Sequence, residues 1–211
     1  MGITIHSSGM INDIGDIPSL VDEVKRIAKG HDWKYEIIDD SFEEPPNAVL
    51  LADSGKPGIN IDGSLGLKGV VLVVDPKAEP LCILFDRSGV LTDILSQISW
   101  LHGDLPAERS SACKTQFGTI DSHICIVDLL ETLKERYIAD LFVEDEGSYW
   151  TTRDRELLSE KRGVLDHYIR HTGDVIRNTK ISPDSADDSA SVASHIEKAL
   201  LDAEAKKGPI H

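Results

Sequence analysis

The sequence lacks the residues and runs that define several large classes of protein. Its 211 residues include three cysteines, Cys82, Cys113 and Cys125, and no two of them form a CxxC pair. Disulfide frameworks and thiolate metal sites need more cysteines at closer spacing, so these thiols are expected to be reduced core residues. No apolar run approaches the roughly 18 residues of a membrane span, and residues 1–5 lack the basic and apolar regions of a signal peptide. The sequence therefore predicts a cytoplasmic protein that does not bind membranes.

Basic residues are also scarce. The chain has 22 Lys and Arg against 37 Asp and Glu, which gives a formal net charge of -15 at pH 7. An acidic surface repels phosphate backbones, so nucleic acid is not an expected partner. The sequence leaves two explanations of this charge open, which are solubility and the attraction of a basic protein.

Apolar residues make up 40% of the chain, which is enough for one folded core. Alternating or continuous apolar runs predict strands, and apolar positions three and four residues apart predict helices. The predicted strands cover residues 3–6, 33–37, 67–74, 81–85, 111–117 and 141–144, and the predicted helices cover 17–30, 122–137 and about 152–173. Residues 90–101 fit a helix or a strand, and the glycine-rich residues 55–69 fit a long connection or small hairpins.

These elements predict an α+β or α/β fold over residues 1–176. We expect a mixed central sheet of about five to seven strands with three main helices packed on it. Two β-α-β units are predicted within this domain, at residues 3–38 and 111–145. The segments after the domain are predicted to be a flexible acidic linker at 177–191, a short amphipathic helix at 192–206 and a disordered end at 207–211.

The unit at 111–145 points to a candidate site. If its two strands are parallel, their carboxyl ends share one edge of the sheet, which is where open α/β sheets bind ligands. That edge would collect His123, Glu144 and Glu146, and also His6 if its strand runs parallel to them. His123, Glu144 and Glu146 are candidate catalytic residues, because neutral imidazole serves as a general base and crowded carboxylates shift one another's pKa. His6, His123 and Glu144 are candidate ligands of a divalent metal, and no other cofactor is indicated.

A ligand at this edge would have further contacts. Trp150 is expected to form a wall against a substrate, with Lys114 and Gln116 as additional ligand-binding residues. Two plainer interpretations stay open. His123 lies on an apolar stripe, which is typical of a hydrogen-bonded core histidine. The neighbouring carboxylates also fit a solvated turn that caps the next helix.

Two functions of different classes follow from these features. The first is a binding or interaction module that acts through a protein partner or by self-association, because an acidic surface and a flexible tail suit docking and no catalytic motif is present. The alternative is a small-molecule or metal-assisted hydrolytic enzyme with its site around His123 and Glu144 to Glu146. The enzyme requires the imidazole and a carboxylate to reach a common point, and side chains on opposite faces of the sheet would eliminate it.

Overall fold

The computed structural model describes residues 2–52, 59–103 and 109–178. Two compact units divide the chain, Met1–Ser159 and Glu160–His211. The predicted linker, terminal helix and disordered end lie outside the described residues, except that residues 177 and 178 belong to helix α5 (Arg155–Asn178). No helix in the described part of the chain is long and apolar enough to cross a membrane.

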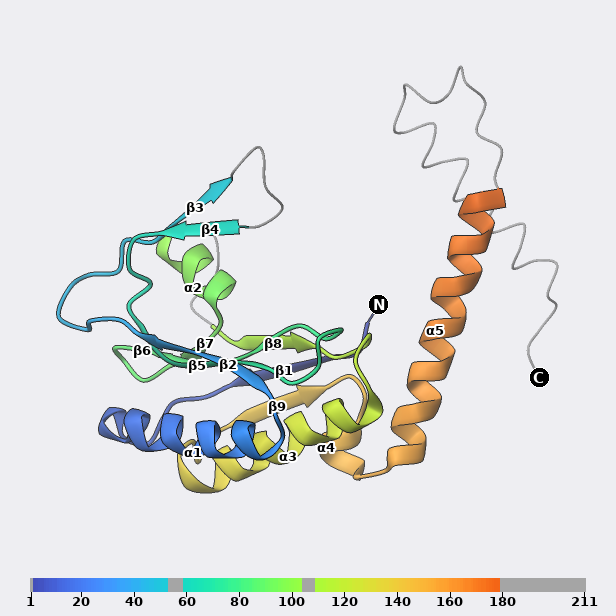
Figure 1. The fold of residues 1–211 in the computed structure, drawn as a ribbon, viewed down its shortest axis with the longest axis horizontal. Coiled ribbons are helices and arrows are strands. Elements are labelled where there is room, and N and C mark those ends of the chain that lie inside the picture. Colours follow the sequence, from blue (N-terminus) through green and yellow to red (C-terminus); the bar gives the residue numbers. More distant parts are fainter. Residues whose placement is uncertain (1, 53–58, 104–108, 179–211) are drawn as a thin grey trace, which may run out of the picture. The chain divides into compact units, whose positions relative to one another are not determined.

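Three sheets form in the first unit (Figure 1). In order of pairing, the first sheet contains β8 (Ser111–Lys114), β1 (Thr4–Ser8) and β9 (Phe142–Asp145). The second sheet contains β2 (Lys34–Asp39), β5 (Leu67–Val73), β6 (Leu81–Asp86) and β7 (Leu91–Thr92). The third sheet contains β3 (Val49–Ala52) and β4 (Ile59–Asp62). All pairs of these strands are antiparallel. The prediction of one mixed sheet is therefore wrong, and the fold is of the α+β class.

The first two sheets are hydrogen-bonded to each other. The amide of Leu91 donates to the carbonyl of Gly9, and the amide of Glu79 donates to the carbonyl of Lys114, at 2.9 Å each. The chain after β1 thus lies beside the chain entering β7, while β1 itself pairs with β8. The two sheets consequently form one layer (Figure 1).

Helices cover both faces of this layer. Helices α1 (Ile17–Gly30) and α3 (Ile120–Arg136) lie on one face, and α2 (Ile94–Leu101) lies on the other (Figure 1). The main apolar core lies under α1 and α3, and a smaller cluster lies under α2. A 3-10 turn (Ile14–Asp16) and the short α4 (Tyr149–Thr152) are also present. The described residues therefore contain more helices than the three main ones that were predicted.

Local patterns explain these elements. In α1, Leu20 and Val24 belong to a buried stripe, and Pro18 occupies the first turn, where its missing amide proton has no cost. Helix α1 ends at Gly30, as predicted, and the left-handed residue beyond it is Asp32, with a φ of 57°. The two strands predicted at 67–74 and 81–85 are confirmed, and they pair with each other as β5 and β6. Residues 90–101 prove to be a short strand followed by α2.

The two predicted β-α-β units have different outcomes. Strands β8 and β9 both pair antiparallel with β1, so they run in the same direction, as predicted, but β1 lies between them. Their ends are therefore two strand spacings apart, or about 10 Å. The unit predicted at 3–38 is wrong, because β1 and β2 belong to different sheets.

Candidate functional site

His123 is the centre of a buried polar chain that joins three elements. It lies in the first turn of α3, where the hydroxyl of Thr119 caps the helix by accepting from the amide of Ser122 at 3.0 Å. The His123 side chain is 2% exposed. Its Nδ1 is 2.7 Å from Oγ1 of Thr115, and its Nε2 is 3.2 Å from Oδ1 of Asp145. These polar side chains thus connect the end of β8, the start of α3 and the end of β9.

Asp145 anchors this chain. Its Oδ1 accepts from the amide of Gly147 at 2.7 Å, and its Oδ2 accepts from the amide of Trp150 at 2.8 Å. Burial alone raises the pKa of Asp145, but the imidazole of His123 and the two amides outweigh burial and hold the pKa below the usual 3.8. The carboxylate is therefore ionised at neutral pH and fixes the turn that follows β9.

The imidazole is enclosed by protein. A Cβ at Gly147 would lie 3.0 Å from Cε1 of His123, so the backbone of this turn rests directly on the ring. Within the described part of the chain, Nε2 has no aligned hydrogen-bond acceptor, although it lies close to the carboxylate of Asp145. This geometry fits a core histidine that stabilises the fold, and it leaves no space beside the ring for a substrate.

Glu144, Glu146 and His6 lie on the other face of the same sheet. His6 stands opposite Glu144 in the register of β1 and β9. Successive residues of a strand point to opposite faces, so Glu144 points away from the face that carries Asp145 and His123. The three outer residues line a cavity of about 270 Å³. The sheet therefore separates His123 from both glutamates, and the site that the hydrolytic alternative requires is not formed.

The candidate metal ligands are divided in the same way. His6 and Glu144 lie on one face of the sheet and His123 lies behind the other. Glu146 is partly engaged, since its Oε2 accepts from the amide of Thr4 at 2.7 Å. Across residues 2–52, 59–103 and 109–178, no group of three or more His, Cys, Asp or Glu side chains could hold a metal ion.

The predicted ligand-binding residues are not gathered either. None of Trp150, Lys114 and Gln116 lines the outer cavity of the glutamates. Trp150 is half-buried, with the guanidinium of Arg153 at 5.5 Å from the centre of its ring. Lys114 has its Nζ 5.8 Å from the ring centre of Phe117. Gln116 is buried, and its Oε1 has no donor among the described residues.

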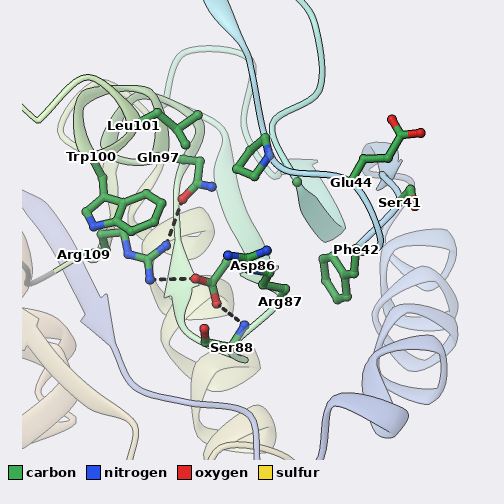
Figure 2. Close-up of a pocket in the computed structure, with 12 residues that line it drawn as sticks. Ser41, Phe42, Glu44, Asp86, Arg87, Ser88, Gln97, Trp100, Leu101 and Arg109 are labelled. Carbon is green, nitrogen blue, oxygen red and sulfur yellow. Dashed lines mark hydrogen bonds and ion pairs between the residues drawn. The ribbon is translucent and has the colours of Figure 1, made fainter.

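A different cavity, of about 410 Å³, lies between α2, the end of β6 and the loop after β2 (Figure 2). Arg109 and Asp86 form an ion pair in its wall, with Nη2 and Oδ2 2.6 Å apart and side chains only 8% and 7% exposed. Arg109 also donates from Nη1 to Oε1 of Gln97 at 3.0 Å. The guanidinium carbon lies 4.4 Å from the ring centre of Trp100. This wall combines a buried charge pair with an aromatic surface.

Sequence reasoning did not find this cavity. One local signal was available, because Asp86 directly follows the apolar run of β6 and begins a turn. Its Oδ1 accepts from the amides of Ser88 and Val90 at 2.8 and 3.0 Å, so the same carboxylate holds the turn and pairs with Arg109. Arg109 lies in no periodic segment, and nothing in the local sequence indicates its partner.

Comparisons with protein-family models, with curated proteins and with solved structures gave no match. Function must therefore be argued from the chain's own surfaces. The features that bear on function include the enclosed His123 chain, the outer cavity beside Glu144, the cavity beside Arg109, and the exposed apolar residues of the third sheet.

Proposed function

We propose that this protein is a binding module that acts through a protein partner, and that the β3–β4 hairpin contacts that partner. The observation that carries the proposal is the exposure of large apolar side chains on this hairpin. Val49, Leu50, Leu51 and Ile61 are 38%, 43%, 49% and 38% exposed. Large apolar side chains that are exposed together on one small element are typical of interaction sites on proteins.

The hairpin exposes apolar side chains on both of its faces. Leu50 stands opposite Ile61 in the register, so these two share one face. Val49 and Leu51 are one residue away along the strand and point to the other face. A strand that served only the core would expose one face and bury the other. The exposure of both faces supports a role in which a partner covers at least one of them.

The edges of the hairpin support the same function. Within the described residues, β3 and β4 pair only with each other. An isolated two-stranded hairpin is marginally stable in water, and its free edges can accept an extended segment from another protein. A partner that adds a strand would satisfy the backbone groups at the edge and cover the apolar side chains.

The charge of the chain indicates the chemistry of the partner. With a formal net charge of -15, the protein attracts basic proteins and repels acidic ones. We therefore propose a basic partner that presents an extended segment with apolar side chains. The hydrolytic alternative has less support, because His123 is enclosed and lies across the sheet from Glu144.

The experiment compares the full chain with two variants. Leu50→Thr combined with Ile61→Thr removes apolar surface from one hairpin face and keeps residues that favour strands. Ile37→Thr is the matched control, because Ile37 is 44% exposed on the edge strand β2. Each immobilised protein is incubated with cell extract, and the retained proteins are quantified by mass spectrometry at low and high salt.

We expect basic proteins that are retained by the wild type and the control, lost with the double variant, and released as salt rises. Identical retention by all three proteins would contradict the proposal. Self-association that the double variant abolishes, measured by light scattering, would place a second copy on the hairpin and would also contradict a basic partner.

A further inference from the structure

The cavity beside Arg109 has the size and walls of a small-molecule site. Its volume of about 410 Å³ falls within the range of ligand pockets, roughly 300–1,000 Å³. Trp100 of α2 and Phe42 of the loop after β2 lie on opposite sides of it (Figure 2). Trp100 is 38% exposed, so its indole is available to a ligand. Aromatic side chains on two sides of a cavity favour a flat, aromatic occupant.

Buried polar contacts hold one wall of this cavity in place. Gln97 is fully buried, donates from Nε2 to the carbonyl of Leu65 at 2.9 Å and accepts from Arg109. Arg109 in turn pairs with Asp86 and supports the indole of Trp100. A wall fixed by such contacts keeps its shape before a ligand arrives, which lowers the entropic cost of binding.

The charges that remain available determine the sign of the ligand. Both oxygens of Asp86 are engaged, one with Arg109 and one with backbone amides, so Asp86 offers little to a cation. Arg87 is exposed and makes no hydrogen bond or ion pair with another described residue. Its guanidinium points into the cavity, while the carboxylate of Glu44 points away from it (Figure 2). Among the described residues, Arg87 therefore offers the cavity a positively charged donor that has no other partner.

From these observations we infer that the cavity binds a small aromatic anion. The ring lies between Phe42 and Trp100, and the carboxylate of the ligand accepts hydrogen bonds from Arg87. A guanidinium can bind a carboxylate through two parallel N–H groups, which selects a planar anionic group over a neutral amide. This inference concerns a different surface from the β3–β4 hairpin, and neither proposal depends on the other.

The test uses 1-naphthoate as the probe and 1-naphthamide as its uncharged counterpart. Binding to the full chain is measured by titration of amide and indole signals in two-dimensional ¹H–¹⁵N NMR spectra. Arg87→Gln removes the proposed contact without disturbing the buried Arg109 pair. Arg26→Gln is the matched control, because Arg26 is a 74% exposed arginine on α1, remote from the cavity.

We expect naphthoate to shift the indole signal of Trp100, which a Trp100→Phe variant identifies. Its affinity should fall about tenfold in Arg87→Gln, stay unchanged in Arg26→Gln, and exceed that of naphthamide in the wild type by a similar factor. No binding, equal affinity for the two probes, or no effect of Arg87→Gln would overturn the inference. Shifts of the signals of Leu50 and Ile61 instead would also overturn it. The proposal for the hairpin would still be decided by the retention experiment described above.

Discussion

The buried ion pair between Asp86 and Arg109 allows a sharp prediction about stability. Asp86→Asn removes the negative charge and keeps an oxygen that can accept from the amides of Ser88 and Val90. The turn after β6 therefore keeps its hydrogen bonds. The change isolates the loss of the counter-ion from any change in local backbone structure.

The size of the effect follows from burial. The guanidinium of Arg109 is 8% exposed and would be left without a counter-ion. Breaking a buried ion pair in this way costs about 3–5 kcal/mol of the free energy of unfolding. Arg109 keeps its hydrogen bond to Gln97 and its contact with Trp100, so we expect a loss of about 3 kcal/mol, at the lower end of that range.

Urea unfolding followed by circular dichroism measures this loss, with a constant m value as the check that the unfolding transition stays comparable. A double variant, Asp86→Asn with Arg109→Met, removes both charges and should recover to within about 1–2 kcal/mol of the wild type. Two results would refute the reasoning. One is a loss below about 1 kcal/mol in Asp86→Asn, and the other is a double variant whose loss equals the sum of the two single losses.

Three further predictions concern other parts of the fold. The pKa of Asp145 in the folded protein lies below 3.8, so its negative charge stabilises the fold above about pH 4. Asp145→Asn should therefore lower the free energy of unfolding by about 1–3 kcal/mol at pH 7, as measured by urea unfolding, and the difference from wild type should narrow as the pH falls below about 4. Burial raises the pKa of Cys113 to about 12, so with a thiol reagent at pH 8 the half-buried Cys125 should react first and Cys113 only after denaturation. Equal reaction rates of the two thiols in the folded protein would contradict this prediction. Gly69→Ala should destabilise the protein by about 2–3 kcal/mol or more in thermal unfolding, because the φ of Gly69 is +146° and the new Cβ would meet a backbone carbonyl of β6. Gly30→Ala is the control, and it should be neutral or slightly stabilising because there is open space around Gly30.

The elements with strong local periodicity were predictable. The buried stripe of α1 and the continuous apolar runs of β5 and β6 fixed their type, because each pattern matches one geometry of side-chain direction. For the glycine-rich residues 55–69 a long connection and small hairpins were both predicted, since glycines permit either, and the pairing of β3 with β4 agrees with the second. The left-handed residue after α1 was not predictable in this way, because Asp32 takes that conformation although glycine adopts it at lower cost.

The candidate site was predictable only in part. Sequence periodicity placed His123 on the buried face of α3, and the structure agrees. Alternation along β9 also determines that Asp145 shares the face of the buried Val143, and that Glu144 points the other way. The grouping of His123 with Glu144 failed because nearness at a strand end was considered without this alternation.

The sequence by itself determined the strongly periodic helices and strands and the acidic charge, because each depends on composition or on spacing over a few residues. Only the tertiary structure decided that β1 lies between β8 and β9, that it pairs antiparallel with both, and that Arg109 reaches Asp86. These contacts join residues far apart in the chain, and their formation depends on how several buried faces pack together. No local pattern carries that information, since the same runs of residues are compatible with several orders of strands.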